Sequence, residues 1–155
     1  MIDRKRTGIA ALALSATALV GIALHEGYSD KAIIPVPGDV ATIGFGTTGG
    51  VRMGDTITPP KALARALTDV QKFEDALRTC VTVPLHQYEY DSYLSLAYNI
   101  GPTAFCHSTL VRKLNAGDYE GACQAILAWT KFRGKTLPGL VKRRQEEYKL
   151  CKGES

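Results

Sequence analysis

Two carboxylic acids and a threonine in the first third of the chain have the residue types and spacing of a hydrolytic site. Glu26 directly follows an apolar segment, and Asp39 and Thr42 come next, where a short sheet is expected to begin. A carboxylic acid at the end of a hydrophobic helix is desolvated and would stay protonated near neutral pH, as a general acid must. Two carboxyl groups facing each other across a gap can hydrolyse a glycosidic bond. Glutamate at a helix end and aspartate in a Pro-Gly-Asp turn are also common structural residues, so spacing alone leaves both interpretations open.

Other chemistries fit the sequence less well. Residues 44–49 match G-x-G-x-x-G, but a turn and further strand follow them instead of the helix that a dinucleotide site requires. His25-Glu26 lacks the second histidine of a zinc motif, and His86 and His107 are distant in the sequence, so we expect no metal and no cofactor.

The composition is that of one globular domain with a core. The chain has 155 residues, 45% of them hydrophobic and 22% charged, and a formal net charge of +4. A mild positive charge suits an acidic polymer such as cell wall or nucleic acid. Because the basic residues are interleaved with acids and the chain looks exported, we expect no nucleic-acid partner.

An apolar segment near the N-terminus predicts export. Residues 8–24 are uncharged and follow Arg4, Lys5 and Arg6. As a helix they would just span a bilayer, with the basic side in the cytoplasm. Ten of the 17 residues are Ala, Gly, Ser or Thr, so insertion would be marginal. We favour an uncleaved, weakly held anchor over residues 1–24 and a catalytic domain over 25–155. A signal peptide cleaved after Ala16-Thr17-Ala18 and a buried core helix are the alternatives.

Four cysteines follow the apolar segment, with no C-x-x-C pair, which favours disulfides in an oxidising periplasm over buried free thiols. Three pairings are possible. We prefer Cys80–Cys106 with Cys123–Cys151, because each bridge would join the two ends of one helix-and-return unit.

Periodicity predicts an α+β fold with an N-terminal helix, a small antiparallel sheet and a larger helical lobe. The glycine-rich stretch 36–58 predicts the sheet, with Gly49-Gly50 as a turn. Helices are predicted from about Pro59 to Thr79, around residues 90–100, on both sides of 115–118, and from Pro138 onward. The basic residues of the last helix, Lys142, Arg143 and Arg144, are expected to form a solvated face.

Several blocks occur in order between Glu26 and about Cys151: Glu26-Gly27, Thr42-Ile43-Gly44-Phe45-Gly46, Asn99-Ile100-Gly101, residues 108–118, and residues 137–144. Together these blocks resemble the phage-type lysozymes, glycoside hydrolase family 24. The apolar N-terminus resembles the signal-anchor-release endolysins of that family.

The resemblance implies a lysozyme-like fold and a catalytic Glu, Asp and Thr. Glu26 and Thr42 match their motifs as proton donor and as a residue that helps hold the attacking water. The family's usual place for the middle residue falls on Pro35 or Val36 here, so Asp39 is our candidate and Asp30 the spare. Three further residues are candidates for the substrate cleft, with core or helix-cap roles as their alternatives: Phe45, Tyr28 and Asn99.

The resemblance also implies a bacteriolytic endolysin that acts on peptidoglycan. It would cleave the β-1,4 bond between N-acetylmuramic acid and N-acetylglucosamine with inversion, as a monomer, and so lyse the host. The anchor would hold it at the inner membrane, inactive, until release into the periplasm lets residues 8–24 pack against the helical lobe. A lytic transglycosylase and a non-catalytic, membrane-tethered wall-binding protein are the alternatives.

Overall fold

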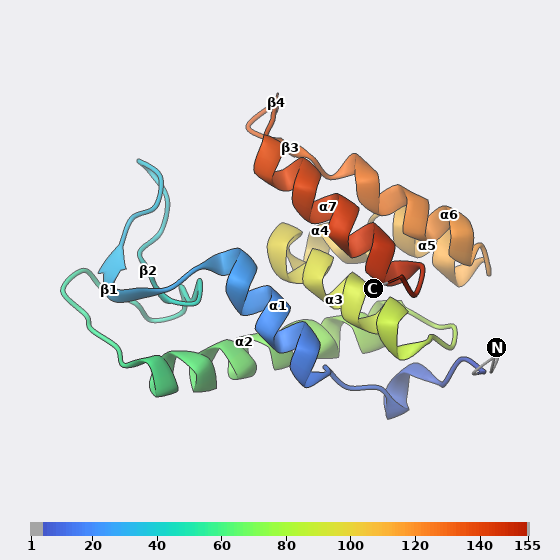
Figure 1. Cartoon of the computed structure of the whole chain (residues 1–155), viewed down its shortest axis with the longest axis horizontal. Coiled ribbons are helices and arrows are strands. Elements are labelled where there is room, and N and C mark those ends of the chain that lie inside the picture. The colour runs from blue at the N-terminus through green and yellow to red at the C-terminus, as the bar shows by residue number, and fades with distance from the viewer. Residues whose placement is uncertain (1–4, 155) are drawn as a thin grey trace. The chain divides into compact units, whose positions relative to one another are not determined.

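The computed structural model describes residues 5–154, so Arg4 of the basic cluster and the first residues of the expected anchor lie outside the described residues. The elements run along the chain in the order η1 (Ile9–Ala11), α1 (Ala16–Glu26), β1 (Ser29–Ile33), β2 (Thr42–Gly44), α2 (Pro59–Cys80), α3 (Gln87–Ile100), α4 (Pro102–Cys106), α5 (Thr109–Asn115), α6 (Tyr119–Ala125), η2 (Ile126–Ala128), β3 (Lys131–Phe132), β4 (Lys135–Thr136) and α7 (Pro138–Cys151) (Figure 1).

The chain divides into two compact units, which we describe separately. One unit, the sheet unit, comprises residues 19–72 and contains most of α1, the β1–β2 sheet and the first half of α2. The other, the helical unit, comprises the described residues 5–18 and 73–154, with the end of α2 and all of α3 to α7.

The core of the helical unit is built around α3. Every residue from Glu89 to Ala97 is buried, and α3 packs along α7. The helix ends where it does because Gly101 adopts a φ of 94°, a left-handed conformation that favours glycine. The large fully buried side chains of this unit are Leu77, Leu85, Tyr90, Tyr93, Leu94, Leu96, Phe105, Leu110, Leu114 and Arg144.

The last helix, α7, does not present the solvated basic face expected from its sequence. Arg143 and Arg144 are 6% and 0% exposed, because both pair with the buried Glu147 of the same helix. The Glu147 carboxylate also accepts a 2.7 Å hydrogen bond from the Ser95 hydroxyl of α3. A charged side chain can be buried when it is paired with an opposite charge. The expectation of a solvated face rested on the three basic residues alone and did not take into account Glu147, which lies one helical turn further along α7.

The small sheet lies earlier in the chain than predicted. β1 pairs antiparallel with β2, with Ser29 opposite Gly44 and Ile33 opposite Thr42, so only the second strand falls inside the predicted stretch 36–58. The polar sequence of β1 hides it, since of its five residues only Ala32 is buried. Gly49-Gly50 does form a turn, as predicted.

The helix predictions downstream of the sheet are confirmed, with α2, α3, α5, α6 and α7 in the expected places. The short helix α4 and the two-residue strands β3 and β4 were not predicted. Disulfides join Cys80 to Cys106 and Cys123 to Cys151, the pairing that the sequence analysis preferred.

The apolar segment 8–24 is interrupted. It forms the short η1 and then enters α1 at Ala16, with Ser15 accepting a 3.1 Å hydrogen bond from the Ala18 N–H in the manner of a helix N-cap. Within residues 5–154, none of the helices combines the length and apolar character needed to cross a membrane.

Residues 6–15, the N-terminal segment, are fastened to the helical unit through three buried carboxylates. Arg6 donates to both oxygens of Glu89, which is 2% exposed, and its guanidinium lies 3.6 Å from the centroid of the Tyr119 ring. Two further attachments follow the same pattern: the Leu14 N–H donates to Glu74 at 2.6 Å, and the Ser15 N–H and hydroxyl both donate to Asp91. A buried carboxylate is costly unless hydrogen-bonded, so these contacts hold the segment in place.

Backbone pairing and a buried phenol support the same attachment. Thr7 and Leu85 exchange two 2.8 Å backbone hydrogen bonds. The Tyr90 hydroxyl donates to Glu74 at 2.8 Å, and burial, followed by this hydrogen bond, raises the pKa of the Tyr90 phenol. The phenol therefore stays protonated and remains a donor to that carboxylate.

Replacing Arg6 tests how strongly the N-terminal segment is held. We expect Arg6→Met to lower the free energy of unfolding by about 2–4 kcal/mol, because it leaves the Glu89 carboxylate buried without its cation. Urea unfolding measures the loss. The neighbouring exposed lysine gives the control, and Lys5→Met should change stability by no more than about 0.5 kcal/mol. Equal losses in the two variants would contradict this account of the attachment.

Candidate functional site

Glu26 is the last residue of α1 and is half-buried. The helix ends there because Gly27 follows with a φ of 70° and donates its N–H to the Ala23 carbonyl at 3.1 Å. The left-handed conformation turns the chain out of the helix and into β1. The carboxyl group therefore stands at the junction of helix and sheet, as the sequence predicted.

A tight turn after β2 meets the Glu26 side chain. Residues 43–47, which we call the glycine turn, are closed by two backbone hydrogen bonds of 2.9 and 3.0 Å between Ile43 and Thr47. Gly46 has a φ of 83°, and a Cβ placed on it would lie 3.0 Å from Glu26 Oε2. The carboxyl group thus packs directly on the glycine backbone, so the motif needs glycine at this position for both conformation and space.

Asp39 lies on the loop that leads into β2, and Thr42 is the first residue of that strand. Asp39 is exposed, and its Oδ1 accepts a 2.9 Å hydrogen bond from the Val40 N–H. Thr42 is half-buried, and its hydroxyl donates to the Val40 carbonyl at 3.3 Å. Both side chains are thus tied to the backbone of the same residue. The spare candidate, Asp30, is exposed within β1.

The two aromatic candidates, Tyr28 and Phe45, contact each other with tilted rings. The ring centroids of Tyr28 and Phe45 are 5.3 Å apart at an interplanar angle of 46°. The Tyr28 hydroxyl donates to the Ile57 carbonyl at 3.2 Å, while the residue stays 43% exposed. A half-exposed aromatic pair offers an apolar surface on which a sugar ring could lie.

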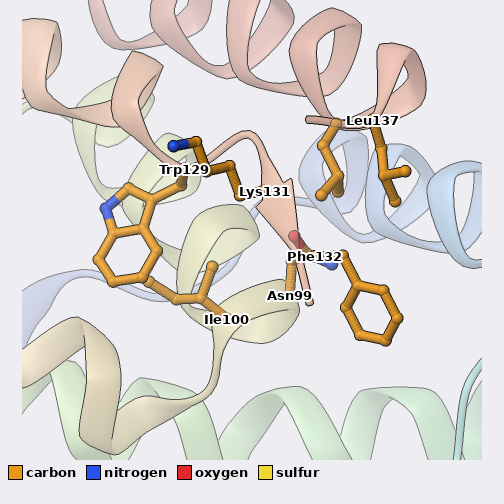
Figure 2. A pocket seen from close by; sticks show the side chains of 7 residues that line it. Asn99, Ile100, Trp129, Lys131, Phe132 and Leu137 are labelled. Atoms are coloured by element: carbon orange, nitrogen blue, oxygen red, sulfur yellow. The ribbon is translucent and has the colours of Figure 1, made fainter. Parts of the chain in front are cut away.

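Asn99 belongs to the helical unit, where it lines a pocket of about 440 Å³. Asn99 and Ile100 come from the end of α3, Trp129 follows η2, and Lys131 and Phe132 belong to β3 (Figure 2). In Figure 2 the Trp129 ring lies beside Ile100, with the Asn99 amide between Ile100 and Phe132. The remaining lining residues are Leu137 and Leu140. An aromatic wall with one amide and one amine suits a ligand that is partly apolar and partly hydrogen-bonding.

Sequence reasoning named only Asn99 as a cleft residue of this pocket. Leu137 and Leu140 lie in the resemblance block 137–144, whereas Trp129 and Phe132 carried no functional signal. Phe132 and Leu137 are 45% and 39% exposed, and that exposure shows only in the folded chain. Over residues 5–154 the structure holds no cluster of three or more His, Cys, Asp or Glu side chains able to bind a metal ion.

The chain is similar in sequence and in fold to known proteins. A family model described as phage lysozyme matches residues 23–147. The chain is 43% identical over 141 residues to the endolysin of Acyrthosiphon pisum secondary endosymbiont phage 1, covering 88% of this chain and 96% of that protein. It is 36% identical over 140 residues to the SAR-endolysin of Pseudomonas phage phiKMV, covering 88% and 86%.

A solved structure shows the same fold. The endolysin from Escherichia coli O157:H7 phage FAHEc1 superimposes with a TM-score of 0.81 at 35% identity, covering 91% of this chain and 94% of that one. The predicted lysozyme-like α+β fold is therefore confirmed. All the candidate catalytic and cleft residues, from Glu26 to Asn99, lie inside the matched region.

Gly46 in the glycine turn and Gly50 outside it have similar positive φ angles but differ in the space around them. Comparing their alanine variants therefore separates the effect of backbone conformation from the effect of a steric clash. Gly46→Ala and Gly50→Ala both force alanine into a positive φ, 83° and 70°, so each should lower stability by about 1–2 kcal/mol. A Cβ at Gly50 meets nothing within 4 Å, whereas one at Gly46 meets the Glu26 carboxyl. We expect wall-clearing activity to fall at least tenfold in Gly46→Ala only, since small misplacements of a reacting group are costly. Equal activities in the two variants would argue against the contact.

Proposed function

Because this chain belongs to the phage lysozyme family, we propose that it is an endolysin that hydrolyses peptidoglycan and so lyses the host cell. The observation that carries the proposal is the Glu26 carboxyl group at the end of α1, packed on Gly46 of the motif Thr42-Ile43-Gly44-Phe45-Gly46. That motif lies within the region matched by the family model.

In the proposed mechanism Glu26 protonates the glycosidic oxygen between N-acetylmuramic acid and N-acetylglucosamine. A water molecule oriented by Asp39 and Thr42 attacks the anomeric carbon as positive charge develops on the sugar. The Thr42 hydroxyl is half-buried on the strand that enters the glycine turn, and Asp39 stands three residues before it. This activity is that of a lysozyme, EC 3.2.1.17, acting with inversion at the anomeric carbon.

Substrate contacts are assigned by exposure and chemistry. The Tyr28–Phe45 pair and the pocket beside Asn99 are proposed to bind parts of the wall polymer, because both combine apolar rings with hydrogen-bonding groups. The formal charge of +4 favours approach to an acidic wall. We expect the protein to work as a monomer, without a cofactor or nucleic acid.

Three carboxylate variants test the mechanism. We expect Glu26→Gln to lower wall-clearing activity at least 100-fold, because the amide cannot donate the proton, and Asp39→Asn to lower it strongly as well. Asp30→Asn is the matched control and should keep activity. Thermal melts check that each variant is folded.

The products separate the remaining interpretations. Reducing muramic-acid ends support hydrolysis, whereas anhydro-sugar ends would identify a lytic transglycosylase. Full activity in Asp39→Asn would move the second carboxylate to another residue. Wall binding by the wild-type protein without any glycan cleavage would instead identify a non-catalytic wall-binding protein.

We also propose that residues 1–24 hold the protein in the host inner membrane after export, with residues 25–155 as the catalytic domain outside the cytoplasm. Lys5 and Arg6 precede the apolar segment, as the positive-inside rule requires of the cytoplasmic side. Val20 and Leu24 of α1 are 57% and 79% exposed, so they are not held in a core of the folded protein. The match to a protein named SAR-endolysin supports the same proposal.

Anchoring in this way is incompatible with the attachment of the N-terminal segment. With residues 8–24 in the bilayer, Arg6 would lie at the cytoplasmic face and Glu89 outside, so their ion pair would be broken. Glu26 would lie two residues from the outer membrane surface, too close for a cleft around it to receive wall polymer. Release into the periplasm would restore the ion pair and the active enzyme.

The anchor is tested by its strength. Ala16 and Thr17 are exposed in α1, so Ala16→Leu with Thr17→Leu should leave the folded enzyme intact while holding the membrane more strongly. In cells expressing the wild type, collapse of the membrane potential should move the protein from the membrane to the soluble fraction and start lysis. The double variant should be released more slowly. A wild-type protein that is soluble throughout would contradict the anchor.

A further inference from the structure

The end of the glycine turn is fastened to α2 by one buried hydroxyl. Thr47 is 2% exposed, and its Oγ1 donates to Oδ2 of Asp69 at 2.7 Å. A hydrogen bond from a hydroxyl to a carboxylate is roughly twice as strong as one between neutral groups. Asp69 also lies 3.5 Å from the ammonium group of Lys72 in the same helix.

The start of the turn rests on the same helix. Gly44 has a φ of 64°, and a Cβ placed on it would lie 3.0 Å from Cβ of Ala62 in α2. The turn is therefore seated against α2 at Gly44 and bonded to α2 at Thr47. Gly46 lies between these two points, and the Glu26 carboxyl group packs against its backbone.

We propose that Asp69 is a positioning residue for Glu26, acting through Thr47 and the glycine turn; the proposal rests on the proposed role of Glu26 as proton donor. Asp69 touches neither substrate nor the reacting atoms. Its carboxylate holds the Thr47 hydroxyl by a hydrogen bond and so fixes the last residue of the glycine turn. The position of the turn then determines the position of Gly46 and of the Glu26 carboxyl group that packs against it.

The reaction is sensitive to this support. A general acid must stand about 2.6–3.2 Å from the oxygen that it protonates. A displacement of about 1 Å can cost on the order of 100-fold in rate, so a shift of a few tenths of an ångström in the turn would lower kcat by about tenfold. The same shift would also move Phe45, which lies in the glycine turn and is proposed to contact the glycan, so KM is expected to change as well and kcat is the quantity that reports on the general acid.

Steady-state kinetics on soluble peptidoglycan fragments, with thermal melts of the same samples, test the proposal. Thr47→Val removes the hydroxyl at nearly constant volume, and Asp69→Asn keeps the size of the side chain but weakens the acceptor. We expect each to lower kcat about tenfold. Thr47→Ser keeps the hydroxyl and should restore kcat to within about twofold of wild type.

A double variant and two matched controls complete the test. Thr47→Val with Asp69→Asn should be no slower than either single change, because both remove the same hydrogen bond. Thr68→Val and Asp75→Asn alter exposed residues of α2 and should keep the wild-type kcat. If Thr47→Val does not fold, Asp69→Asn decides the question.

The result that overturns the proposal is a lower melting temperature in Asp69→Asn with an unchanged kcat, since the pair would then serve stability alone. That result is distinct from failure of the proposed function, which would appear as full activity in Glu26→Gln.

Discussion

A buried carboxylate needs a hydrogen-bond donor, and three buried carboxylates of the helical unit receive donors from the N-terminal segment, residues 6–15. Glu74, Glu89 and Asp91 are each at most 6% exposed, and each accepts hydrogen bonds from the N-terminal segment. Removing one of these donors while its carboxylate stays buried would cost much more than the loss of one surface contact. Ser15, which binds Asp91, also caps α1, so the same attachment determines where that helix begins.

The other end of α1 is governed by a different constraint, the space available beside a glycine backbone. Glu26 ends the helix, and Gly46 lets its carboxyl group approach the turn to a distance that a side chain would forbid. The sheet itself is small, but it delivers Thr42 and the glycine turn from one strand. The close contact between Glu26 and Gly46, rather than an extensive sheet, therefore shapes the proposed catalytic region of this unit.

The apolar segment 8–24 has a place in the folded protein and, in the proposed anchored state, in the membrane. In the proposed anchored state its small residues would make it a weak membrane segment, and small residues also allow close packing in a folded protein. Its polar attachments lie on residues that flank or interrupt the apolar stretch, namely Arg6, Leu14 and Ser15. In the proposed anchored state those donors would be withdrawn from the helical unit, so release from the membrane and completion of the fold would be one event.

The sequence by itself determined the α+β class, the family and the helices α2, α3, α5, α6 and α7, because those depend on local periodicity, caps and short motifs. The amphipathic spacing of α2, the Gly101 end of α3 and the preferred cysteine pairs are examples. It also selected Glu26 and Thr42 from their motifs, and Asp39 as the nearest carboxylate to the expected place. Only the tertiary structure revealed β1, whose polar residues conceal it, and the pocket beside Asn99, whose other walls come from β3 and α7.

The decisive contacts likewise join residues that are far apart in the chain. Arg6 meets Glu89 across 83 positions, and Thr47 meets Asp69 across 22. The sequence around one residue of each pair does not predict the other residue. A hydrogen bond between distant residues depends on where the fold places the two atoms and not on their neighbours in the sequence. The sequence therefore determined which groups could react, and the folded chain decided what holds them.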